Sequence, residues 1–454
     1  MAITLVKRLV VVSMSLALVV SQVLPATAVE KSSRSIPLVR DAEAEALIAD
    51  YARPLLKVAG LGSSNVDIRI VNDERFNAFV ADNRHIFVTS GAIMDTRTPN
   101  ELIGILAHEI GHLAGGHLAQ LREELKNARI MAIIGALGGV AAGVAGGSGQ
   151  GAVAGALAGQ QFAQRSVLAY QRGQEQSADS AAFTYLSKTH QSGSGMISVF
   201  ERLSSQDLFA SRYGDPYMRS HPMASDRLSH AESVARKSKY FNAKDDPAFV
   251  ARHELVRAKF IAFVDSPQKV AKVYPKSDDS LPAAYAQAIL AYRIGSPTDA
   301  LAKVDGLIKR QPKNPWFHEL KGQILIETGK PGASIGPYQT AVSLAPSSGY
   351  LKVMLGHAQV ASGNDKYLND AIANLRKGLA DDPDAAIGYR QLGIAYARSG
   401  NIPLADLATA EGYLAAGDIT SARQYAARAR EALKRGTPAW LRAEDIVNQS
   451  PRRP

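Results

Sequence analysis

The second half of the chain repeats its glycines at a nearly constant interval, and this restricts the fold more than any other feature. The intervals are 34, 34 and 37 residues, between Gly295, Gly329, Gly363 and Gly400. A proline follows each of the first three glycines by 17 to 20 residues, at Pro312, Pro346 and Pro383. Because glycine and proline punctuate helices, each period predicts a pair of helices. Pairs that recur at this length stack into a superhelix with a concave face.

This period is that of the tetratricopeptide repeat. Gly417 and Ala422 indicate a last, irregular unit that acts as a cap. We therefore predict an α-solenoid of tetratricopeptide repeats over residues 251–454, and we expect it to bind proteins on its concave face.

The length and composition of the chain predict more than one folded domain. A chain of 454 residues, with 46% hydrophobic and 21% charged residues, is too long for one ordinary core. We expect a signal peptide at residues 1–28, a first globular domain at residues 29–250 and the repeats at residues 251–454. The absence of cysteine excludes disulfides, zinc–thiolate sites, cysteine nucleophiles and a lipid on an N-terminal cysteine.

The N-terminus has the pattern of a secretory signal. Lys7 and Arg8 precede the apolar run Leu9–Val20, and Ala26–Ala28 fits the small-residue cleavage site. The alternative is an uncleaved anchor, but the apolar run is short for a membrane span. We expect cleavage, a polar leader at residues 29–40 and a location in a bacterial periplasm, which suits a secreted chain without cysteine.

The net charge of +10 admits two further kinds of partner, nucleic acid and an anionic membrane surface. The basic residues are scattered along the chain and form no aromatic–basic module. We therefore expect no nucleic-acid partner.

The first domain is predicted to combine helices with a small β-sheet. Helical periodicity covers Asp41–Val58, and three runs rich in Val, Ile or Phe follow at Val66–Val71, Phe76–Val80 and His85–Thr89. Pro99–Leu121 has the proline start and the apolar spacing of one continuous helix.

A long segment without charge follows that helix. Residues 130–164 divide into Ile130–Ala145, a turn at Gly146–Gly151 and Ala152–Gly159, and Arg165–Ser187 then has helical periodicity. One interpretation is a membrane hairpin, although both arms are shorter than the roughly 20 residues of a span. The other, which we prefer, is two closely packed helices inside a domain, because the segment is rich in Gly and Ala.

The chemistry of the chain is indicated by the segment His108-Glu109-Ile110-Gly111-His112. Residues four apart on a helix lie one above the other, so His108 and His112 can bind one Zn²⁺ through imidazole nitrogen. Glu109 lies beside them on the helix and can accept a proton from water during peptide hydrolysis. The motif therefore predicts a zinc peptidase.

A catalytic zinc site needs a third protein ligand. The metzincin class would place a histidine where Leu118 stands, so that class is excluded. His117 falls roughly 180° from His108 on a continuous helix, which favours a structural role. Glu175 and Asp179 share a face of a second helix, where Glu175 can bind zinc and Asp179 can hold a ligand histidine by its other nitrogen. Spacing alone does not distinguish this pair from a solvated acidic face.

Several motifs together resemble the gluzincin family that contains the HtpX heat-shock protease and the CAAX prenyl proteases, in particular its periplasmic members with tetratricopeptide repeats. The motifs are Asn77-Ala78-Phe79, Ile86-Phe87-Val88-Thr89-Ser90-Gly91, the segment His108–His112, Glu175-Gln176-Ser177-Ala178-Asp179, and Ser220-His221-Pro222. The likeness covers most of the chain after the signal, with the repeats matching by period more than by residue.

The resemblance implies the roles of five residues. His108, His112 and Glu175 would bind one Zn²⁺, Glu109 would be the catalytic base, and Asp179 would support a ligand histidine.

It also implies roles for a loop and a strand. His221 would approach the zinc and block water, although it can equally be a loop histidine without metal contact. Arg227 would stabilise the oxyanion or the loop. Substrate would add to an edge strand formed by His85, Ile86, Phe87, Val88 and Thr89.

We therefore predict a mainly α protein with a small β-sheet, in which a zincin-type metallopeptidase domain precedes the repeats. The resemblance implies an endopeptidase that degrades misfolded or stalled envelope proteins, among them outer-membrane β-barrel proteins. The repeats would recruit these substrates or the outer-membrane assembly machinery, and peripheral membrane contact is also expected. Two alternatives stay open: a chaperone-like scaffold with latent proteolysis, and an integral-membrane protease.

Overall fold

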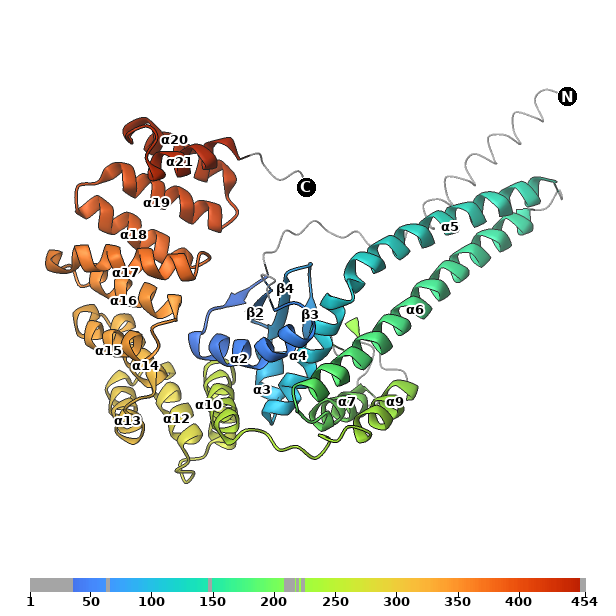
Figure 1. The fold of residues 1–454 in the computed structure, drawn as a ribbon, viewed down its shortest axis with the longest axis horizontal. Helices are drawn as coiled ribbons and strands as arrows, with labels where there is room; N and C mark the ends of the chain where they lie inside the picture. Colours follow the sequence, from blue (N-terminus) through green and yellow to red (C-terminus); the bar gives the residue numbers. More distant parts are fainter. Residues whose placement is uncertain are drawn as a thin grey trace. The chain divides into compact units, whose positions relative to one another are not determined.

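The structure of the protein is a computed structural model, which describes residues 36–62, 66–145, 149–207, 217, 220–221 and 225–449. For residues 132, 135–145, 149–163, 206–207 and 225–226 it describes the backbone only. The predicted signal peptide and residues 146–148 of the predicted turn lie outside the described residues. The fold is mainly helical with one small sheet, followed by helical repeats, so the predicted fold class is confirmed (Figure 1).

The chain divides into two compact units. The first contains Ile48–Val250, and the second contains Asp41–Leu47 together with the chain from Ala251 onward. The start of helix α2 (Ala42–Val58) thus belongs with the repeats, although no local pattern separates it from the first domain.

The segment Asp41–Leu47 is held in the second unit by a buried ion cluster. Lys259 Nζ lies 2.7 Å from Asp41, 3.4 Å from Glu43 and 3.5 Å from Glu319, and Tyr285 donates to Glu43 at 2.9 Å. Removing one partner from a buried ion pair costs about 3–5 kcal/mol, because the other charges stay buried and uncompensated. The cluster therefore fixes where α2 begins.

The sheet of the first unit has four strands in the order β1-β2-β4-β3. The strands are β1 (Leu38–Val39), β2 (Asp67–Val71), β3 (Ala78–Val80) and β4 (His85–Thr89). β2 and β4 are parallel, and β1 and β3 pair antiparallel with their neighbours. The three predicted β runs form strands, while β1 lies in the segment expected to be a polar leader.

The helix with the His-Glu motif begins with a clear start signal. In α4 (Pro99–Ala114), Pro99 occupies the first turn and the Thr98 side chain accepts the Glu101 N–H. Proline at the first position and a threonine cap are the residues that helix starts favour. α4 follows α3 (Ser90–Asp95), and most of its side chains are buried, which fixes its orientation in the core.

The predicted continuous helix Pro99–Leu121 is wrong in one respect. α4 ends at Ala114, and α5 (His117–Ala145) begins after a break at Gly115 and Gly116. Gly116 has a φ of 63°, the left-handed conformation that ends helices at glycine. The break redirects the chain, so the angular argument that placed His117 away from the motif does not apply.

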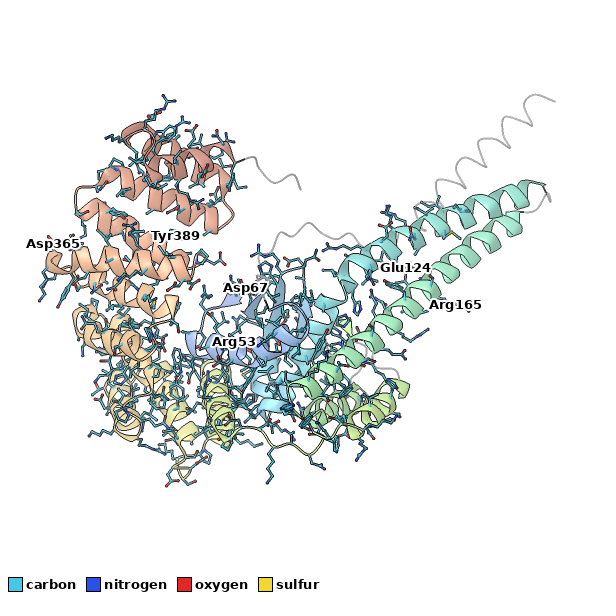
Figure 2. All side chains as sticks on the ribbon, viewed as in Figure 1. Arg53, Asp67, Glu124, Arg165, Asp365 and Tyr389 are labelled. Atoms are coloured by element: carbon cyan, nitrogen blue, oxygen red, sulfur yellow. The ribbon has the colours of Figure 1, made fainter. Side chains whose placement is uncertain are left out.

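The uncharged segment forms a long antiparallel helical hairpin. α5 runs beside α6 (Gly149–Lys188), and the two pack against each other along their length (Figure 1). Ser166 of α6 donates to Glu124 of α5 at 2.8 Å, and Tyr170 of α6 donates to Gln120 of α5 at 2.9 Å. Figure 2 labels Glu124 on α5 and Arg165 on α6. Among the described residues, no helix has an apolar stretch long enough to cross a membrane.

In the described part of the first unit, the helices after α6 are α7 (Ser194–Asp207), α9 (Ser225–Arg236) and the first residues of α10 (Pro247–Val264). α7 packs on α4, and α9 packs on α6 and α7.

The second unit continues through α11 (Pro267–Val273), α12 (Leu281–Arg293), α13 (Pro297–Arg310), α14 (Pro315–Glu327), α15 (Pro331–Leu344), α16 (Gly349–Ala361), the short 3₁₀ helix η1 (Asp365–Tyr367), α17 (Leu368–Asp381), α18 (Ala386–Arg398), α19 (Ile402–Ala415), α20 (Ile419–Ala432) and α21 (Pro438–Asn448).

The periodic glycines stand where one helix of a pair ends and the next begins. Gly295, Gly329, Gly363 and Gly400 have φ values between 71° and 84°. Only glycine adopts this conformation without a steric penalty, so the period in the sequence records the helix ends. Successive helices pack on one another through the unit, as expected for stacked repeats.

Candidate metal centre

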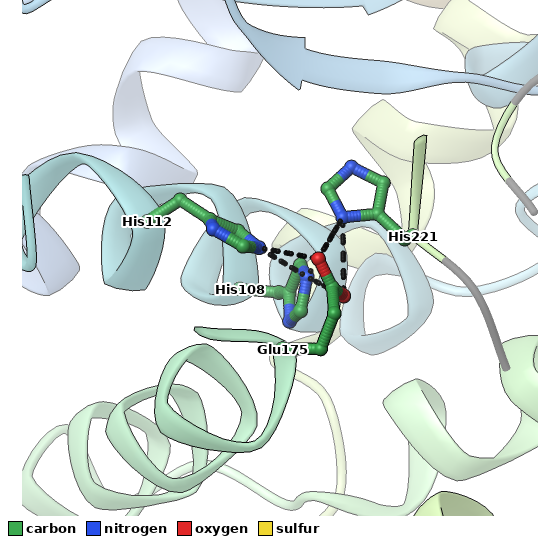
Figure 3. A group of neighbouring side chains, drawn as sticks. All are labelled: His108, His112, Glu175 and His221. Atoms are coloured by element: carbon green, nitrogen blue, oxygen red, sulfur yellow. Dashed lines mark hydrogen bonds and ion pairs between the residues drawn. The ribbon is translucent and has the colours of Figure 1, made fainter. Parts of the chain in front are cut away.

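Four side chains from three parts of the first unit converge on one point. His108 and His112 come from α4, Glu175 comes from α6, and His221 comes from the segment before α9 (Figure 3). Each offers one ligand atom, and these atoms lie within 4.8 Å of one another. The structure therefore brings together the three predicted zinc ligands and the predicted loop histidine.

The imidazoles face each other through the same nitrogen. His108 Nε2 and His112 Nε2 are 3.0 Å apart. The carboxylate of Glu175 spans both rings, with Oε1 at 3.2 Å from His112 Nε2 and Oε2 at 3.4 Å from His108 Nε2. Two nitrogens and a carboxylate that point at a common centre form the donor set that catalytic zinc takes in proteins.

The other nitrogen of His108 is held by Asp179. His108 Nδ1 lies 2.9 Å from Asp179 Oδ1, and this contact leaves Nε2 directed at Glu175. Ligand histidines in metal sites typically donate their second nitrogen to a carboxylate, which fixes the ring and the tautomer. Asp179 thus lies where the sequence predicted it.

Arg227 is buried among carboxylates. Its Nε and Nη2 lie 2.5 and 2.9 Å from Asp179, and its Nη1 lies 2.8 Å from Glu175 Oε2. The same Nη1 is 3.4 Å from the carbonyl oxygen of His221. Of the two predicted roles, these contacts fit support of the loop and of the ligand carboxylates, because they engage the guanidinium fully. The predicted oxyanion role has no contact behind it here and stays a prediction.

Glu109 is completely buried next to the cluster. Among the residues that the structure describes, neither of its carboxylate oxygens has a hydrogen-bond partner, and Oε1 lies 3.4 Å from His221 Nε2. Burial raises its pKa. A buried carboxylate without a partner is costly unless another group occupies the space beside it, which fits a base that faces a water molecule.

His221 covers the centre from the side of the sheet. Its Nδ1 is 3.1 and 3.2 Å from the two oxygens of Glu175, and its Nε2 is 3.3 Å from the carbonyl oxygen of Ala78. The ring of Tyr217 lies against it at 4.6 Å between centroids. The sequence did not single out Tyr217, because a lone tyrosine carries no motif.

The carboxylates of the cluster favour positive charge on the histidines beside them. Burial opposes ionisation of Glu175, but the neighbouring His221 and His108 outweigh it and hold the pKa of Glu175 well below its usual range. Burial likewise opposes protonation of His108, and the neighbouring carboxylates of Asp179 and Glu175 outweigh it and raise the pKa of His108.

A charge count for the metal-bound state agrees with this. A bound metal ion requires neutral imidazoles. The carboxylates of Glu175, Asp179 and an ionised Glu109 would then face the single guanidinium of Arg227, which leaves two negative charges uncompensated. One divalent cation would neutralise them, and the residues present therefore fit zinc.

Gly111 explains how the two ligand helices approach so closely. A Cβ atom at this position would lie 2.8 Å from the carbonyl oxygen of Ala178 on α6. Real Cβ contacts are essentially never that short, so any side chain at 111 would push α6 away. The glycine inside the His-Glu motif therefore sets the distance between His112 and Glu175.

The prediction that β4 is an edge strand for substrate is wrong. β4 pairs with β2 on one side and with β3 on the other, so His85, Ile86, Phe87, Val88 and Thr89 have no free edge. The edge strand beside α4 is β3, and Phe79 and Val80 line the cleft that contains Glu109 and His112. The sequence could not show this, because strand order depends on pairings between distant segments.

His117 also lines this cleft, contrary to the expectation of a remote position. Its Nδ1 is 3.0 Å from His112 Nδ1, and the rings meet edge to face at 5.0 Å. The two adjacent glycines before it were the signal in the sequence that could have revealed the break.

Two families of known proteins match the chain. The profile of peptidase family M48 matches residues 40–235, and the tetratricopeptide repeat profile matches residues 285–349. The first match contains the whole four-residue cluster, and the second lies within the stacked helices.

Individual relatives resemble the chain over different lengths. A beta-barrel assembly-enhancing protease of Yersinia pestis is 24% identical over 424 residues, which cover 93% of this chain and 86% of that protein. A protein of the same name from Escherichia coli K12 is 22% identical, and the match covers 91% of this chain and 84% of that protein. The metalloprotease YcaL of Escherichia coli K12 is 30% identical over 186 residues, which cover 40% of this chain and 68% of that protein. The chain therefore belongs to peptidase family M48, with tetratricopeptide repeats after its peptidase domain.

Proposed function

We propose that the protein is a zinc-dependent endopeptidase that cleaves extended segments of unfolded or misassembled proteins. One observation carries the proposal: the ligand atoms of His108, His112 and Glu175 converge beside the buried carboxylate of Glu109, whose oxygens accept no hydrogen bond among the described residues. The bound ion would be one Zn²⁺, held by these three residues.

The chain's own residues divide the work of hydrolysis. Zinc, when bound, acts as a Lewis acid on the scissile carbonyl and makes water more acidic. Glu109 accepts a proton from the attacking water and returns it to the leaving amine. Asp179 keeps His108 in the tautomer that presents Nε2, and Arg227 holds Asp179 and Glu175 in place.

The free edge of β3 offers a place for an extended substrate. The Thr89 N–H donates to the carbonyl oxygen of Asn77, and the Ala81 N–H donates to the carbonyl oxygen of His85. Backbone groups alternate in direction along an antiparallel strand, so those of Ala78 and Val80 point away from β4. A substrate strand that pairs there would lie along the cleft containing Glu109.

His221 would hold the enzyme in a blocked state. It contacts Glu175 and the outward carbonyl of Ala78, so it covers both the metal ligand and the edge strand. Substrate and His221 therefore compete for the same groups, and the segment must move before cleavage.

The cellular setting is proposed from the relatives and the N-terminal pattern. We place the protein in the periplasm and propose envelope proteins, particularly outer-membrane β-barrel proteins, as substrates. The repeats would bind these or their assembly machinery. Exposed apolar side chains on α5 (Ile130, Met131, Ile133 and Ile134) support a peripheral membrane contact, which release by alkaline carbonate would distinguish from integration.

A second candidate function is a chaperone-like scaffold in which binding by the repeats dominates. The observation that favours it is the covered metal centre, because a blocked enzyme can still bind partners.

Glu109→Gln tests which function dominates. The substitution removes the base but no ligand, so we expect casein cleavage to fall about 10²–10⁴-fold while zinc content stays unchanged. Glu123→Gln, on the exposed face of α5, is the matched control and should retain full activity. If the Glu109→Gln protein still performs the whole cellular task in a deletion strain, the scaffold function is favoured.

His221→Ala tests the blocked state. Hydrogen bonds to charged groups contribute about 1.5–3 kcal/mol, so loss of the contact with Glu175 should raise peptidase activity by up to roughly 10–100-fold. The exposed His230→Ala on α9 should leave the initial rate of casein cleavage unchanged. A His221→Ala protein no more active than wild type would argue against the block.

Val80→Pro tests substrate addition to β3. Proline removes an outward N–H without breaking a bond to β4, so we expect kcat/KM for an unfolded substrate to fall about 2–10-fold through loss of one backbone bond. Val80→Ala keeps the N–H and provides the control for the lost side chain. Equal kcat/KM values for the two variants would rule out pairing through this group.

A further inference from the structure

His117 reaches the metal centre only because the chain breaks between α4 and α5. The left-handed Gly116 turns the backbone, and α5 then begins with His117. Its side chain lies back over Gly115, where a Cβ atom would come within 2.3 Å of His117 Nε2. The ring thus occupies the space that any other residue at 115 would fill.

The His117 backbone is fixed from the opposite helix. The Gln174 side chain on α6 donates to the carbonyl oxygen of His117 at 2.8 Å. Gln174 directly precedes Glu175, so one turn of α6 holds both His117 and the carboxylate that faces His112. His117 and Gln174 are both buried.

The contact between the two histidines has a defined proton arrangement when His112 binds a metal through Nε2. The lone pair of Nε2 is then used, so the single proton of the neutral ring is on Nδ1. His112 Nδ1 is 3.0 Å from His117 Nδ1, which must accept this proton and therefore carries its own on Nε2.

We propose that His117 is a positioning residue for the metal centre, which accepts the Nδ1 proton of His112 and so holds the His112 ring with Nε2 toward the ion. It is the counterpart of Asp179, which holds His108 in the same way. The inference rests on the proposed zinc site and assigns a role to a side chain that is not itself a ligand. A neutral acceptor at this point adds no charge to the cluster, whereas a carboxylate would add one.

The test is the zinc affinity of full-length protein, measured by competition with a chromophoric chelator. All variants carry Glu109→Gln, so that self-digestion does not interfere. His117→Leu keeps the bulk but removes the acceptor, and we expect zinc to bind about 10–100-fold more weakly, as for other groups that support a ligand. His117→Asn places an amide oxygen near the position of Nδ1, and we expect it to restore most of the affinity.

A second variant reaches the same contact without touching His117. Gly115 has an ordinary helical φ of −74°, so Gly115→Ala is allowed by the backbone but displaces the His117 ring. It should weaken zinc binding in the same direction as His117→Leu. Gly173→Ala on α6 meets no atom within 4 Å and should bind zinc as the parent does.

The outcomes separate this inference from the proposed function. If the parent binds no zinc, the metal site itself is wrong. If the parent binds zinc and His117→Leu binds it equally well, the positioning role is overturned. If His117→Leu and His117→Asn weaken zinc binding equally, His117 acts by packing alone and the proton-accepting role is wrong.

Discussion

The packing of α6 across α4 is the constraint on which the site depends. Gly111 allows the backbone at Ala178 to approach α4, and this places Glu175 against both imidazoles and Asp179 against His108. Neither helix contains a metal site alone. Because the two ligand sets are more than sixty residues apart in sequence, the long hairpin of α5 and α6 is what returns the chain to the motif.

The carboxylates make this packing dependent on positive charge. Glu175 and Asp179 are buried, and the guanidinium of Arg227 binds both of them. Buried carboxylates are costly without such partners. The arrangement is therefore stabilised by cations, one supplied by α9 and the other expected at the converging imidazoles. His221 and Ala78 then connect this charged centre to the edge of the sheet, so under the proposed function substrate and metal would share one approach.

Local signals in the sequence predicted the parts that depend on local structure. The period of Gly295 and its equivalents gave the repeats because a left-handed helix end needs glycine. The spacing of His108 and His112 predicted that both imidazoles lie on one face of a helix, because residues four apart are one turn apart. The break before His117 and the order of β3 and β4 were missed, since both depend on tertiary contacts. The sequence also did not show that α2 begins within the repeat unit. That start depends on a contact between Asp41 and the distant Lys259.

X-ray absorption at the zinc edge of the purified full-length protein measures the proposed coordination itself. We expect stoichiometric zinc whose nearest neighbours are nitrogen and oxygen, with the scattering signature of at least two imidazoles, and loss of the metal on replacing Glu175 by alanine. Protein that contains no zinc, or zinc whose environment has no imidazole and does not change in Glu175→Ala, would contradict it.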